Sequence, residues 1–113
     1  MHVVDPVRFR LGELEFTWNL GKGAANMRKH GITFEEAATT WLDPLAIERF
    51  DDEHSGDEDR WVRVGASLRG ALLVTWSTER PMAETTRIRI IGARRANRAE
   101  RRLYEEAAEE RGE

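Results

Sequence analysis

The sequence predicts one α+β domain over residues 1–113, with two N-terminal helices, an antiparallel meander sheet and a C-terminal helix. A chain of 113 residues is the size of a single domain whose core is large enough to fold unaided. Strand-forming residues dominate 60–65 and 71–76, and arginine and isoleucine alternate with the period of a strand in 87–91. Residues 93–108 contain no glycine or proline and are rich in alanine, arginine and glutamate, which favours a helix.

The N-terminal part begins with a strand and a helix. Residues 14–18 alternate apolar and polar side chains, which predicts a strand, preceded by a loose or edge-pairing segment over 3–10. Asn19 can serve as the N-cap of a helix over 22–30, because its side chain can accept a hydrogen bond from the first helical turn. Gly31 can end that helix, since glycine readily adopts the left-handed conformation of a C-cap.

A second helix and a short strand follow. Thr33 and Glu36 have the spacing of a capping box, which predicts a helix from there to about Leu42. The helix should stop at Asp43-Pro44, because the residue before a proline is disfavoured in the helical conformation. Residues 46–50 then predict a short strand.

Turns join the remaining strands. The acidic segment 51–59, with a glycine at its centre, predicts a hairpin connection. Arg69 and Gly70 predict the next turn, and 79–85 a further turn before the last strand. Strands joined in succession in this way predict the meander.

Composition excludes several classes of protein. No run approaches the roughly 20 apolar residues of a membrane span, and no apolar segment follows a basic start as in a signal peptide. Without cysteine, disulfides and thiolate metal sites are excluded, and the cytoplasm is the expected location. The net charge of -3 gives no general attraction to nucleic acid, but arginine dominates 87–102 while acids collect elsewhere. A nucleic-acid site would therefore be a local basic patch.

Arg94 and Arg95 lie where the last strand should give way to the last helix. Two consecutive guanidinium groups are costly to bring together unless an anion lies between them, and their donor forks match phosphate. The alternative is a solvated helix face, as for Arg101 with Glu105 at i,i+4 spacing. No acidic residue lies close to the first pair in sequence, so an anion-binding role is predicted for it.

The first helix carries a basic and polar stripe. Lys22, Asn26, Lys29 and His30 fall at i, i+4, i+7 and i+8, and Trp18 lies just ahead of them. A solvated face is the ordinary outcome for such a stripe, and His30 could simply cap the helix C-terminus. The stripe is otherwise a second candidate for contact with an anionic ligand.

His54 lies among carboxylates, close to Glu58 and Arg60, and could act as a general base; the alternative is an exposed loop histidine. The acidic run 51–59 lacks the spacing of a calcium loop, and the chain has no HExxH motif, so no metal site is predicted. Neither a cysteine nor a Gly-x-Ser-x-Gly motif is present, which disfavours a nucleophilic enzyme. Core packing is the ordinary explanation for Trp76, as for the other strand and helix tryptophans.

Taken together, these motifs resemble the BrnT family of type II toxin–antitoxin toxins, which are small ribonucleases with a RelE-like fold. The resemblance covers residues of about 14 to 106 in the family's order, and the combination is specific although each piece alone is weak. The matching pieces are 16–18, 22–37, 43–44, 52–55, 58–60, 65–70, 87–96 and 100–104.

The resemblance implies a bacterial, metal-independent endoribonuclease that needs no cofactor and inhibits translation and growth. RNA carries its own nucleophile, the 2′-hydroxyl, so such a protein needs a base, an acid and cations for the developing charge. The cation candidates are Lys22, Arg60, Arg94 and Arg95, and the proton-transfer candidates are His30, His54, Glu58 and Tyr104. The further candidates for RNA binding are Trp18, Asn26, Lys29 and Arg98.

The implied partner is a BrnA-like antitoxin, with two copies of each chain in a heterotetramer that contacts promoter DNA only through the antitoxin, and no membrane. The chain departs from the family at Gly65-Ala66-Ser67, where Gly-Arg-Ser is common, and in the turn 79–86, which looks longer than usual. The alternative function is a non-catalytic RNA- or protein-binding module that uses the same arginine-rich patch, because fold alone does not prove activity.

Overall fold

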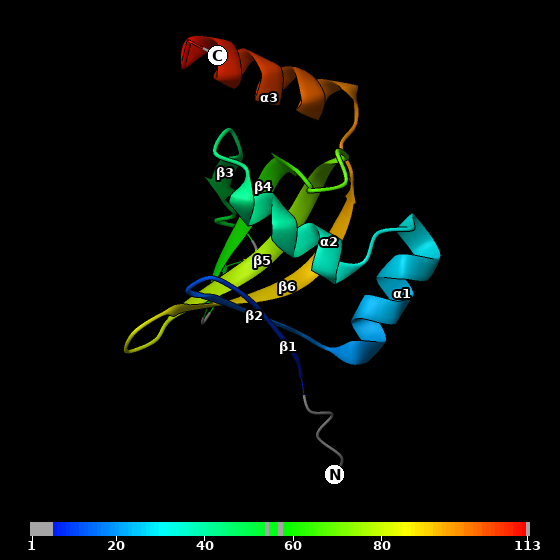
Figure 1. Ribbon diagram of the computed structural model, residues 1–113, viewed down its shortest axis with the longest axis vertical. Helices are drawn as coiled ribbons and strands as arrows, with labels where there is room; N and C mark the ends of the chain where they lie inside the picture. The colour runs from blue at the N-terminus through cyan, green and yellow to red at the C-terminus, as the bar shows by residue number, and fades with distance from the viewer. Residues whose placement is uncertain (1–5, 54, 57, 113) are drawn as a thin grey trace.

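The computed structural model describes residues 6–53, 55–56 and 58–112. The chain folds into a six-stranded sheet; in Figure 1, α2 lies in front of the sheet, α1 beside β6 and α3 above one end. The elements are β1 (Val7–Leu11), β2 (Leu14–Trp18), α1 (Leu20–His30), α2 (Phe34–Ala38), the 3-10 helix η1 (Thr39–Leu42), β3 (Ile47–Phe50), β4 (Asp59–Ala66), β5 (Leu72–Pro81), β6 (Thr86–Arg95) and α3 (Arg98–Glu110). Within the described residues, no helix combines the length and the apolar character that crossing a bilayer requires.

The α+β class is confirmed, but the predicted order of elements is wrong at one edge of the sheet. The strand order is β1-β2-β6-β5-β4-β3, and from β3 to β6 the strands form the predicted antiparallel meander. At the other edge, β1 and β2 form a hairpin that precedes both N-terminal helices, and β2 lies parallel to β6. The sheet is therefore mixed. Strands that are consecutive in sequence usually pair. Here the helices α1 and α2 follow β2, and the next strand, β3, lies at the opposite edge of the sheet.

The core lies between α2 and one face of the sheet, which we call the helix face. Ile88 and Ile90 of β6 are buried there against Phe16 of β2 and Phe34 of α2. The backbone N–H and C=O groups of this buried strand need hydrogen-bond partners on both sides, and β2 of the N-terminal hairpin supplies them along residues 86–89. This explains why the hairpin closes the sheet beside β6.

The helix ends follow the sequence closely. The Asn19 side chain accepts a hydrogen bond from the Lys22 N–H at 3.0 Å, and Gly31 closes α1 at a φ of 70°. The Thr33 hydroxyl accepts from the Glu36 N–H at 3.1 Å, as predicted. The second helix does extend helical structure to the expected end, but its last part is the 3-10 turn η1.

β5 and β6 are longer than the sequence predicted. Pro81 pairs with Thr86, so the connecting turn is confined to 82–85 and its apparent extra length is strand. At its other end β6 continues through Arg95, and α3 begins only at Arg98, although a helix had been predicted from 93. Pairing with β5 and burial of the strand outweigh the helical preference of these residues.

A β-bulge in β6 reverses which side chains face the core. Gly92 pairs with Trp76 and Ile90 with Ser77, so Ile91 is one residue too many for its partner strand. The alternation shifts by one at that point, and Ala93 joins the isoleucines on the helix face. The opposite face of β6 then carries three arginines, listed as Arg87, Arg89 and Arg94. We call this opposite side of the sheet the arginine face.

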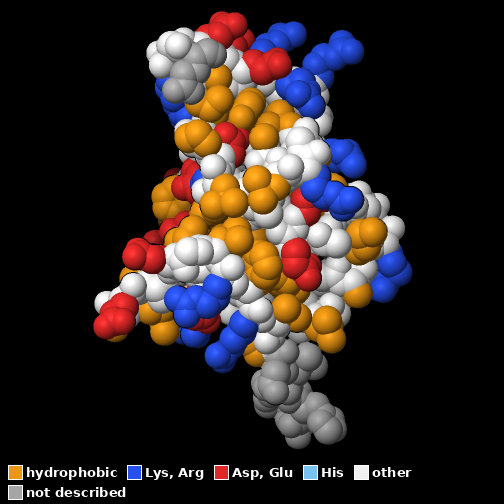
Figure 2. All heavy atoms as spheres, in the orientation of Figure 1, with side chains coloured by type: hydrophobic (Ala, Val, Ile, Leu, Met, Phe, Trp, Pro, Cys, Tyr) orange, Lys and Arg blue, Asp and Glu red, His pale blue; other side chains and the backbone are white. Residues whose placement is uncertain are grey.

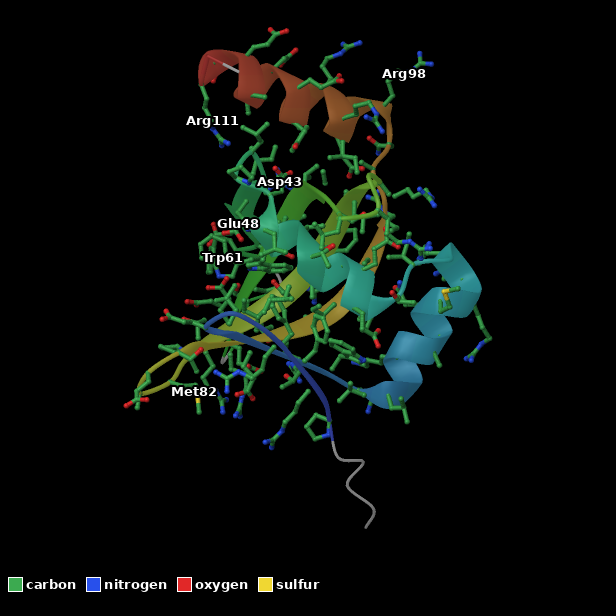
Figure 3. The ribbon with its side chains drawn as sticks, in the orientation of Figure 1. Asp43, Glu48, Trp61, Met82, Arg98 and Arg111 are labelled. Carbon is green, nitrogen blue, oxygen red and sulfur yellow. The ribbon has the colours of Figure 1, made fainter. Side chains whose placement is uncertain are left out.

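α3 packs over the end of the arginine face nearest to the β4–β5 turn, above the sheet in Figure 1. Asn97 caps it with a complete capping box, in which Glu100 accepts from the Asn97 N–H and donates its own N–H in return. Tyr104 packs against Val64 and donates its hydroxyl to Asp43 Oδ2 at 2.7 Å. Figure 3 shows Asp43 in the layer beneath α3, so this contact fastens the helix to the domain.

Burial and the hydrogen bond to Asp43 raise the pKa of Tyr104 to about 12. Burial alone would raise the pKa of Asp43, but it is lowered overall by hydrogen bonds from Ala66 N–H, Tyr104 and Leu45 N–H and by the charge of Arg63. A carboxylate with a lowered folded pKa contributes stability above its unfolded value of 3.8. That contribution is lost as the pH falls through the folded pKa.

We expect Tyr104→Phe to lower the free energy of unfolding by about 1.5 kcal/mol, the lower end for hydrogen bonds to charged groups, because the contact is partly exposed. The acid-side loss of stability should also become smaller, since one group that lowers the pKa of Asp43 is gone. Urea unfolding at pH 7 and at pH 3 measures both effects. An unchanged midpoint at pH 7 would contradict the anchoring role of this contact.

Candidate functional site

A cavity of about 360 Å³, which we call the central cavity, opens where the end of α1 meets the arginine face. It brings together side chains from α1, β4, β5 and β6 that are far apart in sequence. Its lining consists of Asn26, Lys29, His30, Arg60, Trp76 and 91–94. Five residues predicted as site candidates meet here, namely Asn26, Lys29, His30, Arg60 and Arg94.

Arg94 is held in place by two contacts. Its guanidinium makes a bidentate pair with Glu100, with nitrogen–oxygen distances of 2.8 and 2.9 Å, and lies 5.1 Å from the centre of the Trp76 ring. The hydrogen bond to Glu100 raises the pKa of Arg94 and lowers that of Glu100. No acidic residue is adjacent to Arg94 in sequence, but the turn between β6 and α3 brings Glu100 back to it. The side chain is therefore a fixed cation on a rigid strand.

Arg60 approaches the same cavity from β4. Its Nε lies 3.6 Å from Asp51 Oδ2, which is longer than a good hydrogen bond, and this buried Nε has no hydrogen-bond partner among the described residues. The Arg60 side chain is 28% exposed, so the guanidinium can meet a ligand in the cavity through atoms other than this buried Nε. Its terminal nitrogens can donate to a phosphate oxygen there.

Asn26 has a structural role that the sequence did not reveal. Its amide nitrogen donates to the Ile32 carbonyl at 2.9 Å and to the Ala93 carbonyl at 2.8 Å, and its oxygen accepts from the Ala93 N–H at 3.1 Å. These three bonds use both donors of the side chain, so Asn26 binds β6 as a partner strand would. It positions α1, and with it Lys29 and His30, against the cavity.

We expect Asn26→Ala to destabilise the protein by about 1–3 kcal/mol, since it leaves the polar groups of Ala93 without partners at a half-buried position. Asn26→Asp should be at least as harmful, because a carboxylate cannot donate to the two carbonyl groups. Thermal unfolding measures the loss. Hydrogen exchange at the Ala93 amide provides a local readout, and unchanged protection there would contradict the role of Asn26.

The remaining residues of the predicted α1 stripe lie outside the cavity. Lys22 is exposed in the first turn of α1, seven residues before Lys29, which corresponds to about 10 Å along the helix axis. Trp18 is only 3% exposed and packs against Phe34 and the backbone at Gly23, so its ring belongs to the core. Neither side chain reaches the central cavity.

The other predicted residues are placed apart from it as well. Arg95 follows Arg94 on a strand and points to the helix face, where it lines a separate cavity. Tyr104 lies beneath α3 on Asp43, and Arg98 lies in the first turn of α3 and points away from the sheet (Figure 3). His54 lies outside the described residues.

Glu58 lies in a neighbouring cavity of about 190 Å³ on the arginine face. Its carboxylate pairs with Arg89 at 2.9 Å and accepts from the Thr78 hydroxyl at 3.4 Å. This cavity also contains Arg80 and Arg87. Glu58 therefore neutralises part of the arginine face, one cavity away from His30.

The arginine face extends from the central cavity to the edge strand β1. Strand register aligns Arg8 of β1, Arg89 of β6 and Arg60 of β4 in one row across the sheet. A second row contains Arg10 of β1, Arg87 of β6 and Arg80 of β5. The arginines on this face are Arg8, Arg10, Arg49, Arg60, Arg80, Arg87, Arg89 and Arg94. Half of them face an acid, namely Asp51, Glu15, Glu58 or Glu100. Like charges on neighbouring strands destabilise a sheet, so the remaining arginines favour an anion laid across this face.

Sequence reasoning missed most of these arginines and the role of Trp76. The alternation in β1 of Arg8 and Arg10 with apolar residues was the available signal, and it places both on the face opposite the core. Trp76 was predicted to pack in the core; it is partly buried against the apolar cluster of Val64, Leu72 and Val74, and it also carries the Arg94 guanidinium over its ring. The position of Arg94 on this face depends on the bulge, for which the sequence offered no signal.

The central cavity can bind a phosphate and move a proton. Lys29, Arg60 and Arg94 place three cations around one volume, which suits the charge of a phosphate in its ground and transition states. His30 lies in the last turn of α1, where it can donate or accept a proton next to those cations. A proton-transfer group beside cations is the arrangement that general acid–base chemistry at a phosphate requires.

Comparison with protein families agrees with this chemistry. A family model described as "Ribonuclease toxin, BrnT, of type II toxin-antitoxin system" matches residues 18–100, from the end of β2 into α3. No curated protein matches the chain. The matched region includes every residue that lines the central cavity. Because the match covers well over half of the 113 residues, the chain belongs to the BrnT family of ribonuclease toxins of type II toxin–antitoxin systems.

Proposed function

We propose that this chain is a metal-independent endoribonuclease of RelE-like fold that cleaves RNA by attack of the 2′-hydroxyl on the adjacent phosphate and thereby inhibits translation and growth in the cytoplasm. The observation that carries this proposal is the meeting of His30 with Lys29, Arg60 and Arg94 in one cavity. Family membership supports the ribonuclease activity, and the cavity supports this mechanism for it.

In the proposed reaction, the 2′-oxygen forms a bond to phosphorus, and the bond from phosphorus to the 5′-oxygen breaks. The products are a 2′,3′-cyclic phosphate and a free 5′-hydroxyl. The 2′-hydroxyl loses a proton and the 5′-oxygen gains one; His30 takes or gives one of these two protons, and water exchanges the other. Arg60 and Arg94 stabilise the charge that develops on the phosphate. Lys29 adds a third positive charge to the lining of the cavity.

RNA binding is supported by the remaining arginines of the arginine face. A single strand that leaves the central cavity across β6 would meet Arg89 and then Arg87. Arg89 is paired with Glu58 at 2.9 Å and Arg87 with Glu15 at 3.0 Å, so the positive charge of each is partly neutralised. Phosphate contacts of this kind position RNA and carry no sequence information.

The test is cleavage of a defined RNA by the purified protein in the presence of EDTA, with product ends identified by mass spectrometry. We expect fragments with cyclic phosphate and 5′-hydroxyl ends and no loss of rate on chelation. A 2′-deoxy substitution at the cleaved position should block the reaction, because the nucleophile is missing. Tight RNA binding without any cleavage would instead favour the non-catalytic binding module.

We further propose that a BrnA-like antitoxin binds this chain in a complex with two copies of each protein, and that promoter DNA is contacted only through the antitoxin. An acidic or extended antitoxin segment would complement the arginine face and close the central cavity. Co-expression with the neighbouring reading frame, followed by size-exclusion chromatography with light scattering, tests both the association and its stoichiometry. Separate elution of the two proteins, with growth arrest unrelieved, would contradict this proposal.

A further inference from the structure

A second cationic cavity lies on the helix face, behind the edge of β6. It has a volume of about 420 Å³ and is lined by side chains and backbone from α1, α2, the β4–β5 turn and the end of β6. The lining residues are Gly31, Glu36, Arg69, Gly70, Ala71 and Arg95. We call it the Arg69–Arg95 cavity. Figure 1 shows the β4–β5 turn beside the upper end of β6, where these elements meet.

The two guanidinium groups of this cavity lack acidic partners among the described residues. Arg94, by contrast, pairs with Glu100, and Arg89 pairs with Glu58. Arg69 and Arg95 are exposed, and they approach one volume from the β4–β5 turn and from the end of β6. Two like charges that share a cavity repel each other, so an anion bound between them would stabilise the arrangement.

Glu36 is the opposing charge in the lining. Its Oε2 accepts a hydrogen bond from the Ser67 hydroxyl at 2.8 Å, which directs the carboxylate toward the base of the β4–β5 turn. Two arginines and one glutamate leave a net charge of +1 around the cavity. The other walls are Gly31, Gly70 and Ala71, so little side-chain volume blocks a ligand.

This cavity is adjacent to the central cavity across a single strand. Arg94 and Arg95 are consecutive, about 3.8 Å apart at their Cα atoms, and point to opposite faces of β6. The two cavities are also adjacent at the end of α1, where His30 lines the central cavity and the next residue, Gly31, lines the Arg69–Arg95 cavity. Among the described residues, no strand pairs with β6 on this side beyond Arg89, and the Asn26 side chain covers the edge at Ala93. An RNA strand that reaches both cavities would therefore cross β6 past Asn26, at Arg94 and Arg95.

We propose that the Arg69–Arg95 cavity is a phosphate subsite for the RNA substrate, holding the backbone of a nucleotide next to the one cleaved in the central cavity. This inference rests on the proposed ribonuclease function. Arg69 and Arg95 bind substrate without acting on the reacting bond. RNA then bends around the edge of β6, and a duplex, whose backbone cannot make this bend, is a poorer substrate than a single strand.

The test is the salt dependence of binding by a fully 2′-O-methylated 12-nucleotide RNA, which lacks the nucleophile and stays intact. For a single strand, each phosphate contact contributes about 0.7 to the slope of log K against log salt. We expect Arg69→Ala and Arg95→Ala each to reduce the slope by about 0.7. Arg69→Lys should retain it, since the charge remains. Arg102→Ala is the control, because this exposed arginine contributes to neither cavity.

The result separates this inference from the proposed function. Unchanged slopes in Arg69→Ala and Arg95→Ala, with tight wild-type binding, would overturn the subsite and leave the ribonuclease proposal intact. Loss of antitoxin binding in these variants, with an unchanged RNA slope, would overturn it equally. No RNA binding by the wild-type protein would overturn both proposals. Thermal unfolding of each variant confirms that a changed slope does not come from misfolding.

Discussion

Arg94→Ala should slow RNA cleavage by about 10²–10³-fold, the usual effect of removing one preorganised donor that stabilises transition-state charge. The physical reason is the fixed position of the Arg94 guanidinium, which Glu100 and Trp76 hold at the central cavity. Single-turnover cleavage with saturating protein measures this loss without contributions from product release. Growth arrest on induction should disappear in parallel.

Two further variants distinguish catalysis from folding. Arg94→Lys keeps the charge but not the bidentate fork, so it should recover only part of the rate. Glu100→Gln keeps an oxygen acceptor for the Asn97 N–H and removes the negative charge that neutralises Arg94, so RNA binding should tighten. Full activity of a folded Arg94→Ala protein would exclude this residue from the site.

His30→Ala should lower the cleavage rate by about 10²–10⁴-fold, the range for losing a positioned general acid or base. His30 is exposed at the end of α1, so the substitution should change the free energy of unfolding by no more than about 0.5 kcal/mol. His30→Gln retains hydrogen bonding without proton transfer and should be equally slow. RNA binding, measured with the 2′-O-methylated strand, should be nearly unchanged in both variants.

Arg28→Ala is the matched control for His30. Arg28 is exposed in the same last turn of α1 but does not line the central cavity, so its loss should leave the rate nearly unchanged. A normal rate in His30→Ala would assign the proton transfer to another group. An equal loss in Arg28→Ala would show that the effect is not specific to His30. The first outcome would direct attention to His54, which the sequence analysis also proposed.

The parts of the fold that depend on short-range hydrogen bonds were predictable from the sequence. Asn19, Thr33 and Gly31 mark helix ends because the bonds they make or permit lie within three or four residues along the chain. The antiparallel meander followed in the same way from strand period and turn residues. The parallel pairing of β2 with β6 did not, because it joins segments about 70 residues apart.

The candidate site was predictable only in part, and for a related reason. Spacing along α1 indicated a polar stripe, but it could not show that Lys29 and His30 reach the cavity while Lys22 does not. The consecutive pair at 94 and 95 suggested one anion site, whereas strand geometry sends the two side chains to opposite faces. Tyr104 looked like a proton-transfer candidate until its contact with Asp43 was seen.

The bond between Asn26 and β6 also bears on solubility. An unpaired strand edge can template association with another chain, and natural sheets protect such edges with bulges or with covering side chains. Beyond Arg89, the edge of β6 is protected in both ways, by the bulge at Ile91 and by the hydrogen bonds of the Asn26 amide to Ala93. Loss of Asn26 would expose this edge beside the isoleucine-rich core strand. Aggregation during expression, rather than slow cleavage, is then the first defect that such a variant would show.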